Sequence, residues 1–111
     1  MTAVRTRYLV CYDVSDPSIR RMARRLTRLR NALKEDCLPV QYSVFLGDFT
    51  LAGCRGALTR IARIIDPSRD DVRLYPLPVN LQVHVIGRPI LPDGIYTPIR
   101  HWTEPEGNAP R

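Results

Sequence analysis

The hydrophobic pattern begins with a run that predicts a buried strand. Apolar side chains fill nearly every position from Tyr8 to Tyr12, whereas a strand with one face in water would alternate apolar and polar residues. We therefore predict a central strand over residues 5–14. Asp13 comes at the carboxyl end of this strand, so one carboxylate is placed where the apolar run stops.

The following segment changes to a helical period. Apolar residues recur at intervals of three and four, and arginines occupy the positions between them, which is typical of an amphipathic helix. Asp16 and Pro17 favour the N-cap and the first helical position. The predicted apolar stripe consists of Ile19, Met22, Leu26, Leu29 and Leu33.

A second strand and a second helix are expected next. Pro39 interrupts the chain before a strand over Val40 to Leu46. Because Gly47 and Gly53 follow, we expect this strand to bend or double back between them. The second helix is predicted over residues 52–65. Its expected inward residues are Leu58, Ile61, Ala62 and Ile65.

The last third of the chain carries two more strand patterns and a proline-rich end. Residues 71–77 are predicted as a short or edge strand, because Pro76 cannot donate to a sheet ladder. Residues 81–86 alternate apolar and polar side chains, as a last strand would. Five prolines follow from Pro89 onward. We expect residues 89–111 to form a proline-rich extension that packs on a partner subunit and has a disordered end.

The order of these elements predicts an α+β fold. Strand, helix, paired strands, helix and strand make a ferredoxin-like βαββαβ sandwich over residues 1–88. Two helices would cover one face of an antiparallel sheet and leave the other face open, with residues such as Val10 or Leu9 on it. Small domains rarely leave an apolar sheet face in water, so we expect a homodimer that buries it.

Length and composition restrict the class of protein. A chain of 111 residues with 44% apolar residues fits one folded domain. No apolar run reaches the length of a membrane-spanning helix, and the first residues lack the pattern of a secretory signal. The three cysteines form no CxxC pair, so neither a zinc site nor a disulfide framework is expected. We therefore expect a cytoplasmic protein without a membrane partner.

The charge points to an acidic partner. The net charge is +6 and the pI is about 9.8, which favours nucleic acid over a membrane surface, although solubility alone remains an alternative. Residues 16–36 hold 7 of the 17 basic residues. Arg20, Arg24 and Arg28 follow one another at i, i+4 spacing, where like charges repel. A bound phosphate backbone would relieve that repulsion.

Asp13 is the strongest candidate for chemistry. It lies at a strand end, where ligands of α/β proteins often collect, and Asp16 fills the capping position better. One carboxylate is a thin ligand set for Mg²⁺, but a two-fold axis would bring a second Asp13 close. Ser43 is a candidate phosphate contact and a poor nucleophile, and Phe45 is either core or a base-stacking ring. Asp48, Asp70 and Asp71 are expected in turns or in solvent.

Three segments together are similar to one known family. They are Tyr8 to Val14 with Asp16 following, Val40 to Gly47, and Asp71 to Leu77. In order and spacing, the chain resembles the CRISPR-associated (Cas) family two proteins, the small dimeric partners of the integrase in bacterial spacer acquisition. The resemblance covers about residues 7–78.

The resemblance implies a ferredoxin-like fold, a symmetric dimer, and the Mg²⁺-dependent cleavage of RNA or double-stranded DNA reported for some members. Asp13 matches the family's metal-binding aspartate, and Arg20 matches a basic residue early in the first helix. Ser43 and Phe45 fall in the second-strand motif. Many members carry a basic residue before the glutamine of that motif, where this chain has Leu38 and Pro39.

Three functions remain open at this point. The first is a Mg²⁺-dependent endonuclease that acts on single-stranded RNA or on DNA, with Asp13 as the catalytic and metal-binding residue. The second is an architectural dimer that holds duplex DNA beside the integrase, with Arg20, Arg24 and Arg28 on the backbone. The third is a toxin-like RNA-cleaving dimer that acts without the integrase.

Overall fold

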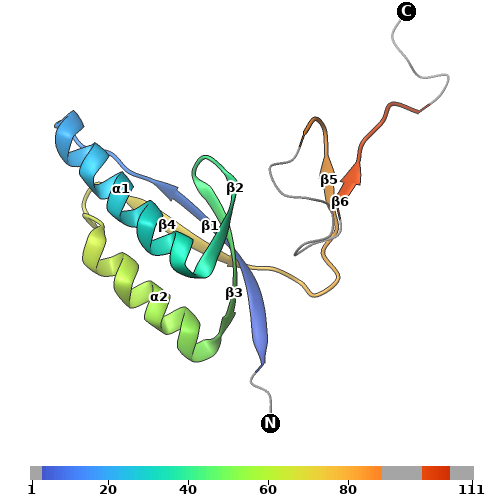
Figure 1. Ribbon diagram of the computed structural model, residues 1–111, viewed down its shortest axis with the longest axis horizontal. Helices are drawn as coiled ribbons and strands as arrows, with labels where there is room; N and C mark the ends of the chain where they lie inside the picture. The colour runs from blue at the N-terminus through green and yellow to red at the C-terminus, as the bar shows by residue number, and fades with distance from the viewer. Residues whose placement is uncertain (1–3, 89–98, 106–111) are drawn as a thin grey trace, which may run out of the picture. The chain divides into compact units, whose positions relative to one another are not determined.

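A computed structural model describes residues 4–88 and 99–105 (Figure 1). The chain forms two compact units, Met1–Val79 and Asn80–Arg111, so the first unit ends before the boundary at 88 that the sequence suggests. Residues 89–98 and 106–111, which make up most of the expected proline-rich extension, lie outside the described residues.

The first unit has the expected order of strands and helices, βαββαβ. Its four strands form one antiparallel sheet in the order β2-β3-β1-β4. The ferredoxin-like α+β fold predicted from the sequence is therefore confirmed. The elements are β1 (Arg5–Asp13), α1 (Ile19–Asp36), β2 (Cys37–Gln41), β3 (Val44–Thr50), α2 (Leu51–Ile64) and β4 (Asp71–Pro76).

The second unit contains two short strands that pair in parallel. They are β5 (Val83–Val85) and β6 (Ile99–His101), and the Trp102 N–H extends the pairing by donating to the Val85 carbonyl oxygen (2.7 Å). The strand expected over residues 81–86 is thus only three residues long. Gly87 follows it with a φ of 106°, a conformation that glycine adopts without steric cost.

Both helices of the first unit cover the same face of the sheet (Figure 1). Val10 and Phe45 are fully buried beneath them. Val10 therefore belongs to the core and not to the open face. The core also contains Tyr12, Val14, Leu29, Leu33, Cys37, Phe49, Cys54, Ala57 and Ile61.

Three residues expected in the apolar stripes of the helices are exposed. Ile19 is 78% exposed and Leu58 is 45% exposed, and Ala62 is exposed as well. Ile19 is the first residue of α1. Leu58 follows the buried Ala57 and so turns about 100° away from the inward face.

The chain reverses between β2 and β3 at an unexpected place. The turn lies at Tyr42 and Ser43, whereas β3 continues straight through Gly47. A bend at Gly47 was therefore a wrong expectation. Glycine is needed there because a Cβ atom would lie 2.9 Å from Cys37 Sγ and would collide with the Phe49 ring.

The sheet face opposite the helices carries a second set of apolar side chains. Leu9 pairs with Leu46, and Cys11 pairs with Val44 in the β1–β3 register. None of these four residues belongs to the core cluster under the helices. The second apolar face predicted from the sequence therefore exists, with these residues on it in place of Val10. Leu9, Cys11 and Val44 are half-buried there, and Leu46 is buried.

A buried arginine joins the loops at one end of the sheet. Arg25 of α1 donates hydrogen bonds to Asp16 Oδ2 (2.8 Å), Asp70 Oδ2 (2.9 Å) and the Ser15 carbonyl oxygen (2.9 Å). The Asp70 carboxylate also accepts the N–H groups of Ser15 and Asp66. We call Arg25, Asp16, Asp70 and Ser15 the Arg25 cluster. It connects the loop after β1 with the loop before β4.

Two expectations about acids in this region are wrong. The N-cap of α1 is Ser18, whose Oγ accepts the Arg21 N–H, and Asp16 instead accepts the Ser18 N–H and pairs with Arg25. Asp70, expected in solvent, has a side chain that is 0% exposed. A carboxylate survives such burial only when it is paired and hydrogen-bonded.

The cluster leads to a first prediction on stability. The Asp70→Ala substitution should lower the free energy of unfolding by about 3 kcal/mol, because it removes one partner of an ion pair and leaves Arg25 without that carboxylate. The neighbouring Asp71→Ala variant removes an exposed ion pair and should cost less than about 1 kcal/mol. Chemical denaturation measures both values, and equal losses would contradict the structural role of Asp70.

Candidate nucleic-acid and metal site

Asp13 lies exposed at the carboxyl end of β1. In the β1–β4 ladder it is directly opposite Asp71, the first residue of β4. Side chains of directly opposed residues in antiparallel strands lie on the same face, with Cβ atoms about 5 Å apart. The fold thus brings together two carboxylates that are 58 positions apart in the chain. The sequence offered no signal for this pair beyond the acidic start of β4.

Asp13 differs from the other acids of residues 4–88 in its surroundings. Of the eight Asp and Glu residues between positions 4 and 88, seven form an ion pair with an arginine. Asp13 is the one of these eight that has no such partner. A carboxylate without an arginine partner is available for a cation.

The opposing carboxylate is already neutralised. Arg73 donates to both carboxylate oxygens of Asp71 (2.9–3.1 Å), and another of its nitrogens donates to the Tyr75 hydroxyl oxygen (3.3 Å). These contacts are exposed, so solvent and salt weaken them. Asp71 would have to exchange Arg73 for a metal ion before it could serve as a ligand.

The acids of the Arg25 cluster serve the structure and not the chemistry. The hydrogen bond from Arg25 lowers the pKa of Asp16, and the Ser18 N–H lowers it further. Burial raises the pKa of Asp70, but hydrogen bonds from Arg25 and from the Asp66 and Ser15 N–H groups outweigh burial and lower it overall. Both side chains are therefore fixed anions at neutral pH and hold the loop that follows Asp13.

The β2–β3 turn is attached to β1 immediately before Asp13. The Tyr12 N–H donates to the Ser43 carbonyl oxygen (3.1 Å), and the Tyr12 hydroxyl donates to the Tyr42 carbonyl oxygen (3.2 Å). These two bonds place half-buried Ser43 in a turn at the same end of the sheet as Asp13, and not inside a strand as expected. Ser43 is thus close enough to this strand end to contribute to one site.

Phe45 does not reach the surface. Its side chain is 0% exposed, and its ring stacks on that of Tyr12 at a centroid distance of 6.2 Å. A ring buried under two helices cannot stack on a base. The expectation of a nucleic-acid contact at Phe45 is therefore replaced by a core role.

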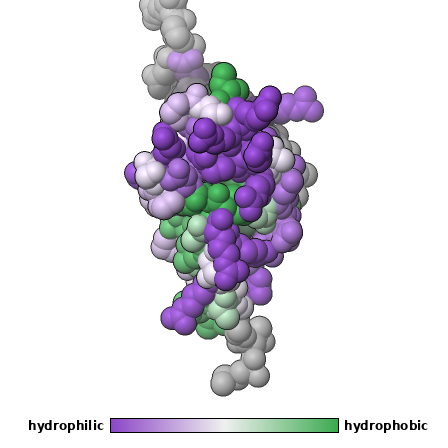
Figure 2. All heavy atoms as spheres, turned by 90° about the vertical axis from the view of Figure 1, so that its left-hand side faces the viewer, coloured by the Kyte–Doolittle hydropathy of each residue, from purple (hydrophilic) through white to green (hydrophobic). Residues whose placement is uncertain are grey.

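The six arginines of α1 differ in their surroundings. Arg20, Arg24 and Arg28 are exposed, as is Arg21, and none of these four has an ion-pair partner among residues 4–88 and 99–105. Arg25, by contrast, is held inside its cluster, and Arg30 is half-buried. Figure 2 shows the side of the molecule where α1 begins, and hydrophilic residues predominate there around a smaller apolar area. The exposed row is free to contact phosphates.

The residues present fit a Mg²⁺ ion only in part. No cluster of three or more His, Cys, Asp or Glu residues occurs in the described portion of the chain. Mg²⁺ binds through one or two carboxylates and keeps several waters, so Asp13 with Asp71 meets the lower limit of what the ion needs. Further oxygen ligands would have to come from a nucleic-acid phosphate or from a second copy of the chain.

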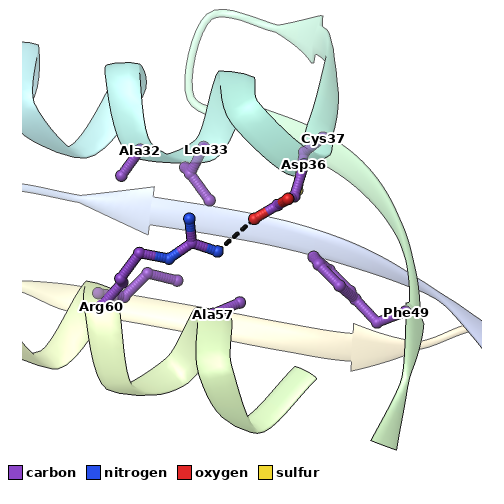
Figure 3. A pocket seen from close by; sticks show the side chains of 8 residues that line it. Ala32, Leu33, Asp36, Cys37, Phe49, Ala57 and Arg60 are labelled. Atoms are coloured by element: carbon purple, nitrogen blue, oxygen red, sulfur yellow. Dashed lines mark hydrogen bonds and ion pairs between the residues drawn. The ribbon is translucent and has the colours of Figure 1, made fainter. Parts of the chain in front are cut away.

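Two hollows elsewhere in the first unit lack the features of a site. Figure 3 shows a small one between α1 and α2, where Arg60 reaches across to Asp36. It holds about 10 Å³, roughly the space of one water. A larger hollow of about 530 Å³ lies where β1 begins. The charged side chains that line it pair with one another as Arg5–Asp48 and Arg60–Glu35. Neither hollow is therefore a better candidate for a functional site than the strand end at Asp13.

Comparison with known proteins identifies the family. The family model described as CRISPR associated protein Cas2 matches residues 6–83, which is more than half of the chain. The chain belongs to the Cas2 family. The resemblance indicated by the three sequence segments is thereby confirmed, and the βαββαβ unit with its strand-end aspartate is the Cas2-family domain of this protein.

Individual relatives agree with this assignment. CRISPR-associated endoribonuclease Cas2 1 of Nitrosomonas europaea is 42% identical over 91 residues, covering 79% of this chain and 78% of that protein. CRISPR-associated endoribonuclease Cas2 2 of Thermodesulfovibrio yellowstonii is 39% identical over 93 residues, covering 83% and 96%. A crystal structure of a Cas2 protein aligns with a TM-score of 0.64 at 30% identity, covering 80% and 94%. No helix in the described part of this chain is long and apolar enough to cross a membrane.

Proposed function

We propose that this Cas2-family protein binds nucleic-acid backbones during CRISPR spacer acquisition and hydrolyses phosphodiester bonds of RNA with Mg²⁺ at Asp13. The observation that carries the proposal is the state of Asp13, an exposed carboxylate at a strand end that has no arginine partner among residues 4–88 and 99–105. The two curated relatives are both named endoribonucleases, which supports RNA as the substrate to test first.

Each group at this end has a defined task in the proposal. Asp13 holds the ion, which would activate water and neutralise charge on the phosphate under attack. Arg20, Arg24 and Arg28 hold the backbone through its phosphates, which fixes position without reading sequence. Ser43, in the adjacent turn, is placed to donate a hydrogen bond to a phosphate oxygen. The Arg25 cluster keeps the loop after Asp13 in place.

A second copy of the chain completes the site in this proposal. One copy supplies one free carboxylate, and the apolar sheet face with Leu9, Cys11, Val44 and Leu46 lies opposite the helices. Pairing two such faces about a two-fold axis would bury the apolar residues and bring two Asp13 side chains toward one ion. Two features therefore support a homodimer: one copy is short of carboxylates for the ion, and no helix of the described chain covers its apolar sheet face.

A second candidate function is architectural. The ligand set of one chain is at the lower limit for Mg²⁺, while the exposed arginine row on α1 needs no metal to bind duplex DNA. In this form the dimer holds duplex DNA beside the CRISPR integrase and Asp13 is dispensable. The first two experiments below on Asp13 and on the arginines separate the two functions.

Replacing Asp13→Ala should reduce the rate of Mg²⁺-dependent RNA cleavage at least about a hundredfold, because the ion loses its one free carboxylate. Nucleic-acid binding should stay at the wild-type level. Asp48→Ala is the matched control, since Asp48 pairs with Arg5 near the opposite end of β1, and its cleavage rate should not change. Wild-type cleavage by the Asp13→Ala protein would leave the architectural function as the better account.

Combined replacement of Arg20→Ala, Arg24→Ala and Arg28→Ala should weaken binding and flatten its salt dependence. The slope of log K against log salt should become shallower by roughly 1 for each lost phosphate contact, about 3 in all. Arg55→Ala with Arg63→Ala removes exposed charges from α2 and should leave a slope closer to the wild-type value. Equal slopes for the two variants would exclude a specific role for the α1 row.

Introducing a charge on the open sheet face should separate the two copies. Leu9→Glu would bury a carboxylate in the proposed interface, which is strongly unfavourable without a partner. Leu58→Glu, on the exposed side of α2, is the control and should remain dimeric. Sedimentation velocity reports both states, with circular dichroism as the check on folding. A wild-type protein that stays monomeric at all concentrations would refute the shared site.

A further inference from the structure

Tyr42 is an aromatic residue that the proposed function leaves without a role. It lies in the β2–β3 turn with 73% of its surface exposed. Its backbone carbonyl is used by the Tyr12 hydroxyl, but its own hydroxyl makes no hydrogen bond to any of the described residues. The other strongly exposed tyrosine, Tyr75, has its hydroxyl bonded to Arg73. The Tyr42 ring is therefore placed in water without a structural reason.

A cation supports this ring from one side. The Arg30 guanidinium carbon lies 5.3 Å from the centroid of the Tyr42 ring, within the range of a cation–π contact. Arg30 Nε is buried and has no hydrogen-bond partner. The contact with Tyr42 holds the guanidinium over one face of the ring, and the ring remains largely accessible.

The turn also has a fixed position relative to Asp13. The β1–β3 ladder ends with Cys11 opposite Val44, and the next bond joins the Tyr12 N–H to the Ser43 carbonyl oxygen. Tyr42 therefore lies in the turn at the same end of the sheet as Asp13. Its ring is on the side of α1, whereas Asp13 alternates with the buried Tyr12 and faces the other side of the sheet. A nucleic-acid strand that crosses this end of the sheet would pass both residues.

We propose that Tyr42 is a base-stacking residue, with Arg30 as the cation that supports its ring. An exposed aromatic ring can stack on a base only when the base is unpaired and turned out of a helix. Stacking is tolerant of sequence, because every base presents a flat π face. This inference rests on the proposed function and adds a contact with a base to the proposed contacts with the backbone.

The test measures affinity without cleavage. Fluorescence anisotropy would compare a labelled single-stranded oligouridine, an abasic oligomer of the same length and a duplex, with a chelator present to prevent hydrolysis. The variants are Tyr42→Ala, Tyr42→Phe, and Leu58→Ala as the control at an exposed side chain on α2. We expect Tyr42→Ala to weaken oligouridine binding about tenfold, while Tyr42→Phe and Leu58→Ala bind as the wild type does.

The abasic oligomer distinguishes stacking from a structural effect. The wild type should bind it about tenfold more weakly than oligouridine, and Tyr42→Ala should bind both alike, because the ring and the base act as a pair. Equal weakening of all three ligands by Tyr42→Ala would show that the change only disturbs the turn and would overturn the proposal.

The duplex separates this inference from the proposed function. Affinity for the duplex should be the same in the wild type and in Tyr42→Ala, since paired bases offer no free face. A wild type that binds the duplex but not the single strand would overturn the stacking role and leave backbone binding intact. A wild type that binds none of the ligands would overturn both.

Discussion

The end of the sheet where Asp13 lies depends on one buried guanidinium. Arg25 joins the loop after β1 to the loop before β4 through Asp16, Asp70 and the Ser15 carbonyl. Two carboxylates around one arginine leave an excess negative charge, and backbone N–H groups offset it. Because a buried pair of this kind is costly to break from one side, the two strand ends cannot easily move apart. The juxtaposition of Asp13 and Asp71 follows from that constraint.

The candidate site consists of charged side chains that have no ion-pair partner among the described residues. Among residues 4–88, arginines neutralise every acid except Asp13, and four exposed arginines of α1 have no ion-pair partner in the described structure. An unpaired carboxylate favours a metal ion, and unpaired arginines favour a phosphate backbone. Both fit a member of the Cas2 family.

Two incomplete features of the fold point to the same missing component. The sheet has an apolar face without helices, and the strand end has a carboxylate set at the lower limit for Mg²⁺. A second copy would complete both in the proposed dimer. The Tyr42 ring is a third feature that needs a ligand, but its flat exposed face is suited to a base and not to a protein core.

Local pattern was sufficient for the elements of this fold. The helical period in α1 and the continuous apolar run in β1 depend on neighbours in the chain, so the βαββαβ order, Asp13 at its strand end and the Cas2-family resemblance could all be predicted. Tertiary packing decided which of two adjacent residues of the same type is taken out of water. Arg24 is exposed and Arg25 is half-buried, and Asp71 is exposed while the Asp70 side chain is buried, because only the position of the facing loop determines which side chain leaves water. The turn at Tyr42 and Ser43 has no glycine or asparagine to mark it, and its contacts with Tyr12 and Arg30 exist only once β1 and α1 are packed together.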